Sequence, residues 1–239
     1  MSQSIGAKKP RKNRSTRRKQ RGLSSEAKAL LAIGILLAVG AAVFLVVVAP
    51  SSSSPAVGQS GRVQSAAILV REDSWQQGPP DAKVTLVEFL DFECEACRAM
   101  YPTVESIRKE YGDRVNFVVR YFPLHKNSVL ASKAAEAAGR QGKHWEMYAT
   151  LFENQQAWGE KSEPQTQLFL GYAQSLGLDM EKFTADMNDS SWDAKVSRDR
   201  ADGVAAGVQG TPTFFVNGTN VGNVMSYSQL KSRLDAALR

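Results

Sequence analysis

Cysteine and histidine are scarce in this chain of 239 residues, which contains two of each. A structural zinc site takes four sulfur or nitrogen ligands, and about three to five residues commonly separate its histidines. The only histidines are His125 and His144, nineteen residues apart, so a zinc site is disfavoured. The two cysteines, Cys94 and Cys97, lie far from the hydrophobic segment that ends at Ala49, which excludes a lipoprotein anchor. We expect no metal ion, and no cofactor beyond the cysteine pair itself.

Charge is absent from residues 29–49, where twenty-one consecutive residues carry no charged or strongly polar side chain. As a helix rising about 1.5 Å per residue, this segment is long enough to cross a hydrocarbon core of about 30 Å. Residues 1–28 hold ten Lys or Arg and a single acid, Glu26, a local charge of +9. Such positive charge beside a membrane span stays in the cytoplasm. We therefore expect a basic cytoplasmic tail (1–28), a single-pass anchor in the cell membrane (29–49) and an extracytoplasmic remainder.

A cleaved signal peptide is the alternative interpretation of this segment. Signal peptides show the same order of charges, but their apolar core is only about 7–15 residues long. The best small-residue cleavage sequence here, Val47-Val48-Ala49, is followed by Pro50, which should impede cleavage. The sequence therefore favours an uncleaved anchor.

The basic character of the chain belongs to its tail. Subtracting the +9 of residues 1–28 from the total of +6 leaves −3 for residues 29–239, although the whole chain has a pI of about 9.3. A nucleic-acid partner for the folded part therefore has little support. Residues 50–66 are rich in Ser, Pro and Gly and indicate a flexible tether, and residues 67–239 follow as one domain.

Hydrophobic patterning predicts alternating strands and helices in this domain. An apolar, β-branched run from Lys83 to Phe92 indicates a buried strand, and Val115 to Phe122 indicates a second one. Between them, apolar residues recur at helical spacing from Cys97 until Gly112. A strand–helix–strand succession of this length predicts a βαβ unit with parallel strands.

The second half of the domain is predicted to begin with a long helical stretch and to end with short strands and a helix. An Ala-rich, mostly helical stretch covers residues 128–206. A third strand at Thr213–Asn217, a hairpin signal at Asn217-Gly218 and a short returning strand that includes Val221 follow it. Tyr227 to Leu238 then forms an amphipathic helix. The predicted fold class is α/β, with a helical insertion between a βαβ half and a ββα half.

The two cysteines stand three residues apart where the first strand gives way to a helix. A disulfide that closes so short a loop adds little stability, so redox chemistry is favoured over an inert structural bridge. The sulfur of Cys94 should face the unpaired N–H groups of the first helical turn, which lower the pKa of its thiol. Cys97, one turn later, can resolve a mixed disulfide. A Cys-x-x-Cys motif beside a βαβ pattern is typical of thiol–disulfide exchange.

Three stretches of the chain resemble the DsbA-like branch of the thioredoxin superfamily over roughly residues 75–239. They are Pro80–Phe89, the Cys94-x-x-Cys97 motif and Gly207–Gly218. The resemblance implies a thioredoxin-like fold whose helical insertion matches residues 128–206.

The resemblance also implies roles for individual residues. Thr211-Pro212 matches a cis-proline dipeptide that lies against the cysteine pair and receives an extended substrate strand. Glu88, six residues before Cys94, matches a buried acid that assists proton transfer beneath the second cysteine. Pro102 matches a proline that kinks the active-site helix.

One position departs from the family pattern. The residues between the cysteines are Glu95 and Ala96, where strongly oxidising members carry Pro-His. We expect Glu95, with Asp91 and Glu93 nearby, to raise the pKa of Cys94 and so to weaken the oxidant. A simple helix-dipole role for Glu95 is the alternative. His125, just after the second strand, is interpreted as structural rather than catalytic.

These observations predict an extracytoplasmic thiol–disulfide oxidoreductase that forms disulfides in exported proteins through Cys94 and Cys97. A reductase or isomerase using the same pair is the alternative within the enzyme class. An anchored, non-catalytic binding module is the alternative from another class. The resemblance further implies that a quinone-coupled membrane oxidoreductase reoxidises the pair.

Overall fold

The structure is a computed structural model that describes residues 66–222 and 224–239. The predicted tail (1–28), anchor (29–49) and nearly all of the tether (50–66) lie outside the described residues. Within the part that is described, no helix is both long and apolar enough to cross a membrane.

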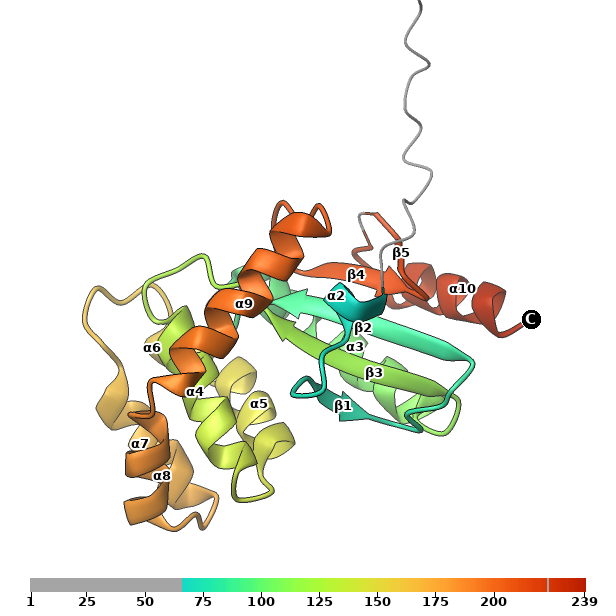
Figure 1. Cartoon of the computed structure of the whole chain (residues 1–239). Coiled ribbons are helices and arrows are strands. Elements are labelled where there is room, and N and C mark those ends of the chain that lie inside the picture. The colour runs from blue at the N-terminus through green and yellow to red at the C-terminus, as the bar shows by residue number, and fades with distance from the viewer. Residues whose placement is uncertain (1–65, 223) are drawn as a thin grey trace, which may run out of the picture. The chain divides into compact units, whose positions relative to one another are not determined.

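A five-stranded mixed sheet forms the centre of the domain, with strand order β1-β3-β2-β4-β5 (Figure 1). The strands are β1 (Trp75–Gln77), β2 (Val84–Leu90), β3 (Val115–Tyr121), β4 (Thr213–Val216) and β5 (Thr219–Asn220). Only β2 and β3 pair in parallel, and α3 (Glu95–Tyr111) connects them, as the βαβ prediction requires. The other pairs, β1 with β3, β2 with β4 and β4 with β5, are antiparallel.

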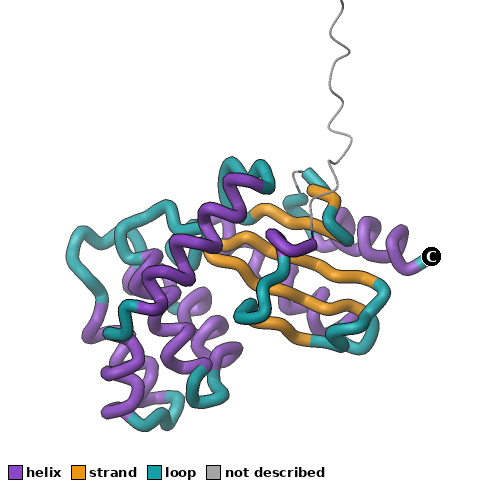
Figure 2. The backbone as a smooth tube through the Cα atoms, viewed as in Figure 1, coloured by secondary structure: helices purple, strands orange, loops and turns teal. Residues whose placement is uncertain are grey.

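Six helices between β3 and β4 form the predicted insertion, of which the first five gather beyond one end of the sheet and the last runs back to it (Figures 1 and 2). They are α4 (Ser128–Gly139), α5 (His144–Glu153), α6 (Gln155–Trp158), α7 (Thr166–Ser175), α8 (Met180–Met187) and α9 (Ser191–Ala205). A short α2 (Ala66–Leu69) precedes the sheet, and α10 (Tyr227–Leu238) follows it. The mixed α/β thioredoxin-like domain with a helical insertion is therefore confirmed.

Alternation along β2 divides its side chains between two cores. Leu86 and Leu90 pack in the large cluster that contains residues of α3 and α10. Val87 and Phe89 pack in a smaller cluster with Leu69 of α2 and residues just after α9. Because successive strand residues point to opposite faces, Glu88 lies on the face that α3 covers.

An ion-pair network holds α9 against the smaller core. Arg120 of β3 is fully buried, and its Nη2 donates to Asp199 Oδ1 at 2.8 Å and to Asp202 Oδ2 at 2.6 Å. Arg71 also binds the Asp202 carboxylate through two hydrogen bonds, of 2.7 and 2.9 Å. Buried charges are tolerated only when they are paired in this way. The network fixes the helix that leads into residues 206–212.

The sheet differs from the sequence prediction at its two edges. The edge strand β1 was not predicted, because the short sequence Trp75-Gln-Gln77 has no apolar alternation. The returning strand ends at Asn220, so the inclusion of Val221 was wrong. Gly222 adopts a φ of 76°, and its N–H donates to Asn220 Oδ1 at 2.8 Å, so a turn ends the strand. Val221 keeps a single ladder-like bond, from its N–H to Phe214 O at 3.1 Å.

Candidate active site

Cys94 occupies the position immediately before α3. Its backbone is extended, with φ −70° and ψ 123°, and its carbonyl accepts an early helical hydrogen bond from Arg98 N at 3.1 Å. The Cys94 side chain is half-buried, whereas Cys97, one turn later, is only 1% exposed. Both cysteines are free thiols, so the structure shows the reduced pair. One sulfur is accessible and the other is shielded.

The loop before β4 brings the predicted Thr211-Pro212 dipeptide to Cys94. The peptide bond between these two residues is cis. The Cys94 thiol donates to the Thr211 carbonyl oxygen across 3.4 Å. The Thr211 hydroxyl is buried and has no hydrogen-bond partner in the described part of the chain, which leaves it free to donate to a thiolate. Residues 117 positions apart therefore meet at one sulfur.

The surroundings of Cys94 lower the pKa of its thiol from its ordinary value to about 5. The largest cause is the Cys97 thiol, which can donate to the Cys94 thiolate. Partial burial opposes the shift, and the Thr211 hydroxyl supports it. The N–H groups of Ala96 and Cys97 lower the pKa further. These N–H groups belong to the first turn of α3, the positive end of the helix, where a thiolate is stabilised.

The pKa of the Cys97 thiol is shifted in the opposite direction, upward. Burial raises the pKa of its thiol well above the ordinary value, and the hydrogen bond to Cys94 and the negative charges of Cys94 and Glu88 raise it further. A thiolate is the nucleophile in disulfide exchange. Cys94 is therefore the thiol that can attack or be attacked from solution, and Cys97 is its internal partner.

Glu88 lies in the interior, on the side of the sheet covered by α3, and is 1% exposed. Burial raises the pKa of its carboxyl to about 8. The Tyr148 hydroxyl of α5 donates to Glu88 Oε2 across 3.4 Å, and this bond and the charge of Arg108 partly oppose the shift. At neutral pH the Glu88 carboxyl is therefore mainly protonated, close enough to Cys97 to affect its pKa.

The acidic residues around the motif differ in what they contact, and the expected effect of Glu95 on Cys94 stays a prediction. The net pKa shift of Cys94 is downward, and no carboxylate is among its principal causes. Asp91 accepts hydrogen bonds from the N–H groups of Glu93 and Leu124, at 2.9 and 2.8 Å. The buried Glu93 accepts from the N–H groups of Asn127 and Glu160, at 2.6 and 3.0 Å. These two acids join loops, while Glu95 points into solvent. Ala96 helps to lower the pKa of Cys94 through its backbone N–H.

Gln155 of α6 is a site residue that the sequence did not indicate. Its amide Nε2 donates to the carbonyl oxygens of Phe92 and Cys94, at 2.7 and 2.9 Å. Its Oε1 accepts from Arg98 Nε at 3.0 Å. The insertion thus holds the backbone of the short segment that joins β2 to α3. A glutamine in a polar stretch carries no local signal for such a contact.

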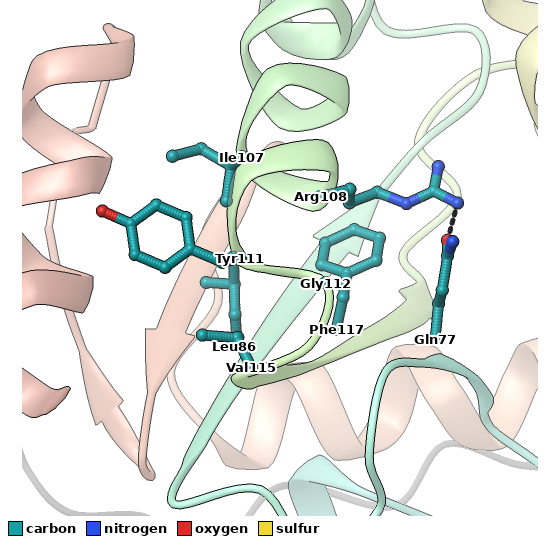
Figure 3. Close-up of a pocket in the computed structure, with 8 residues that line it drawn as sticks. All are labelled: Gln77, Leu86, Ile107, Arg108, Tyr111, Gly112, Val115 and Phe117. Atoms are coloured by element: carbon teal, nitrogen blue, oxygen red, sulfur yellow. Dashed lines mark hydrogen bonds between the residues drawn. The ribbon is translucent and has the colours of Figure 1, made fainter.

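A small cavity lies near the opposite, C-terminal end of α3 (Figure 3). It is bordered by Ile107, Arg108 and Tyr111 of that helix and by Phe117 of β3, and Arg108 bonds Gln77 at its rim. Its volume of about 10 Å³ is roughly what one water molecule requires. This cavity is a packing feature and is separate from the cysteine pair.

Solved structures with this architecture include redox proteins. The thioredoxin-like oxidoreductase from Silicibacter pomeroyi DSS-3 is 28% identical, with a TM-score of 0.63, and the match covers 72% of this chain and 97% of that one. BdbD from Bacillus subtilis, in its oxidised form, is 25% identical with a TM-score of 0.64, covering 74% and 97%. Alpha-DsbA1 from Wolbachia pipientis, at 19% identity and a TM-score of 0.65, shares the fold.

Similar curated proteins are much longer than this chain. The Na⁺/H⁺ antiporter NhaA of Herminiimonas arsenicoxydans is 37% identical over 163 residues, which are 68% of this chain and 25% of that protein. Na⁺/H⁺ antiporter NhaA 1 of Salinispora arenicola is 37% identical over 145 residues, 59% of this chain and 21% of that protein. The chain thus spans about a quarter of the length of these relatives.

A family model described as thioredoxin matches residues 71–236, which is well over half of the chain. The matched range includes both cysteines, Glu88 and the cis-proline loop. The chain therefore belongs to the thioredoxin family.

Proposed function

We propose that this protein is a thiol–disulfide oxidoreductase that forms disulfides in exported proteins through Cys94 and Cys97. The observation that carries this proposal is the asymmetry of the pair, an accessible thiol with a pKa of about 5 beside a buried thiol whose pKa is raised. A stabilised Cys94 thiolate stabilises the reduced form of the enzyme, which makes the disulfide form a stronger oxidant. This argument favours oxidation of substrates over the alternative reductase or isomerase.

In the first step, a substrate thiolate attacks the Cys94 sulfur of the oxidised pair. A bond forms between the substrate sulfur and Cys94, the Cys94–Cys97 bond breaks, and Cys97 leaves as a thiolate. Glu88 is the proposed proton donor, because its carboxyl has a pKa of about 8 and the Cys97 thiol holds a proton more tightly.

In the second step, another substrate thiolate attacks the substrate sulfur of the mixed disulfide. The substrate gains a disulfide and loses two electrons, and Cys94 leaves as a thiolate in the reduced enzyme. Restoring the enzyme disulfide requires a two-electron acceptor. We propose a quinone-coupled membrane oxidoreductase for this role.

Substrate binding is assigned to the loop that contains Thr211 and Pro212. An extended substrate segment beside this loop would bind through main-chain hydrogen bonds, which tolerate many sequences. Ala96 tunes the redox centre through its N–H, and Glu95 through its charge, which is weakened by exposure to solvent. The proposed setting is the outer side of a cell membrane, with residues 29–49 as anchor. The relatives named as Na⁺/H⁺ antiporters fit a membrane setting.

Two measurements test this proposal: the rate at which the protein forms disulfides in a substrate, and the mixed disulfides that its cysteine variants trap. Purified protein is mixed with a reduced, unfolded dithiol protein, and disulfide formation is followed with glutathione disulfide as the terminal oxidant. We expect turnover by the wild type, accumulation of mixed disulfides by Cys97→Ala and little trapping by Cys94→Ala. A non-catalytic binding module would show no turnover. Equal trapping by both variants would contradict the assigned roles of the cysteines.

The direction of the cycle is tested by the equilibrium potential of the pair against glutathione. An oxidase requires a more oxidising potential than thioredoxin, which lies near −270 mV. A value at or below that level would support the reductase instead.

A further inference from the structure

Gln155 begins α6, and its side chain is buried against the segment that joins β2 to α3. Its amide Nε2 donates to Phe92 O at 2.7 Å and to Cys94 O at 2.9 Å. Its Oε1 accepts from Arg98 Nε at 3.0 Å. A carbonyl oxygen only accepts and a guanidinium only donates, so the amide fits this place in one orientation. Both N–H groups of the amide are therefore used on the backbone around the reactive cysteine.

The main chain of Cys94 is held on both sides of its α-carbon. Its N–H donates to the Asp91 carbonyl at 3.1 Å, and its carbonyl accepts the helical bond from Arg98 N at 3.1 Å. A carbonyl oxygen has two lone pairs, and Gln155 uses the one that the helix leaves open. Asp91 and Arg98 are close neighbours in the sequence, whereas Gln155 is 61 residues away. The contact with Gln155 therefore ties the start of α3 to the insertion.

The start of a helix is ordinarily fixed by the side chain at the position that Cys94 occupies. Ser, Thr, Asp or Asn at this position accepts a hydrogen bond from an N–H group of the first turn. Cys94 makes no such bond. In the proposed cycle its sulfur also changes partner, from Cys97 to a substrate sulfur and then to none. The sulfur cannot hold the start of α3 in all of these states, whereas bonds to the main chain are not consumed by any of them.

The position of this main chain decides what the Cys94 sulfur meets. The sulfur lies 3.4 Å from the Thr211 carbonyl oxygen, and α3 begins with the next residue. Stabilisation of a negative charge by helical N–H groups falls off within the first turn. A displaced or fraying helix start would therefore weaken the interaction between these N–H groups and a thiolate.

We propose that Gln155 is a positioning residue of the redox centre, which keeps the Cys94 main chain, and with it the sulfur, in place at the start of α3 while the sulfur changes partner. The contacts with the carbonyls of Phe92 and Cys94 perform this role, and Arg98 orients the amide for it. The inference rests on the proposed function in taking Cys94 as the reactive thiol.

Gln141, in the turn after α4, offers a matched control. Its amide also bridges two backbone groups, since Oε1 accepts from Asp179 N at 2.8 Å and Nε2 donates to Asp179 O at 3.1 Å. This contact joins the end of α4 to the start of α8 within the insertion. Substitution of Gln141 thus removes a contact of the same kind that does not bind the segment before α3.

The test is titration of the Cys94 thiolate, by its ultraviolet absorbance, in the reduced full-length protein. Gln155→Met keeps the length of the side chain but removes its amide. It should decrease the acid dissociation constant of Cys94 about three- to tenfold, because the thiolate loses part of its interaction with the first helical turn. Gln155→Asn, one carbon too short to span the three partners, should shift the constant in the same direction. Gln141→Met should leave it unchanged.

A second readout is amide hydrogen exchange within α3 of the same reduced proteins. In Gln155→Met the Arg98 N–H, which bonds the Cys94 carbonyl, should exchange about fivefold faster, as expected for loss of about one net hydrogen bond. The N–H of Val104, in the middle of the helix, should keep its rate. Such a difference within one helix separates positioning of the helix start from a general loss of stability.

The proposal is overturned if Gln155→Met titrates like the wild type, if Gln141→Met shifts Cys94 as much, or if exchange accelerates equally at Arg98 and Val104. If Gln155→Met does not fold, Gln155→Asn decides by the same criteria. Neither readout requires turnover. A protein that shows these shifts and no exchange activity would therefore contradict the proposed function alone.

Discussion

At the scale of single residues, the chemistry depends on where two identical thiols lie on one helix. Cys94 stands at the start of α3, beside the helical N–H groups and Thr211. Cys97 points into the core, where burial and Glu88 oppose ionisation. A difference in environment alone therefore separates an attacking thiol from a resolving thiol.

Glu88 makes the stability of the domain depend on pH. Its pKa is about 8 in the fold and near the ordinary 4.5 in the unfolded chain. Between these values the folded state holds a proton that the unfolded state has lost, so stability decreases as pH rises. At about 1.4 kcal/mol per pKa unit, the loss is on the order of 3–5 kcal/mol when ionisation is complete.

We therefore expect Glu88→Gln to unfold in urea much like the wild type at pH 5 and to be the more stable protein at pH 9. Both proteins are compared in the reduced form, so that the cysteines contribute alike. Parallel stability curves across this range would contradict a protonated, buried Glu88. The same variant should slow release of Cys97 in single-turnover exchange, because the proposed proton donor is lost.

At the scale of elements, the insertion is fastened to the sheet at two places near the active site. Gln155 of α6 binds two carbonyls of the segment that joins β2 to α3, those of Phe92 and Cys94. Arg120 of β3 binds Asp199 and Asp202 of α9, and the chain then runs directly into the cis-proline loop. One half of the site is thus held by a helix that lies far from it in sequence, and the other half by the helix that directly precedes it.

The α9 network gives a prediction about stability. Asp199→Asn leaves Arg120 buried with only one carboxylate partner, and we expect a loss on the order of 3 kcal/mol in the free energy of unfolding. Asp193→Asn on the same helix is the matched control. Asp193 pairs with Lys133 and its side chain is 54% exposed, so its loss should cost less than about 1 kcal/mol. Equal effects in urea unfolding would show that the buried network does not hold α9.

At the scale of the whole molecule, the chain is divided by composition. A basic tail and an uncharged segment precede the described domain, which is mildly acidic. We expect the full-length protein to stay with membranes through high-salt and carbonate washes. A protease added from outside should cut within residues 50–66 and release a domain of about 170 residues. A mature N-terminus beyond residue 49 would contradict the anchor.

Local signals were sufficient for much of the fold. Apolar runs mark β2 and β3, helical spacing marks α3, and Cys94-x-x-Cys97 marks the redox pair. These features depend on neighbours within a few residues, which is the range over which strand and helix patterns act. The resemblance to known proteins added Glu88, Thr211 and Pro212, which no local pattern connects to the cysteines.

The tertiary structure alone decided the properties that depend on distant neighbours. Asp91 and Glu93 lie near Cys94 in the sequence, but their carboxylates accept hydrogen bonds from loop N–H groups, and the pKa of Cys94 is lowered by the Cys97 thiol and other groups that the fold brings to its sulfur. His125 and Gln155, from separate loops and helices, reach the site only because the chain folds back on it. Sequence determined which groups are present and which segments form strands and helices. Packing determined which groups meet, because electrostatic and hydrogen-bond interactions act over a few ångströms of space rather than along the chain.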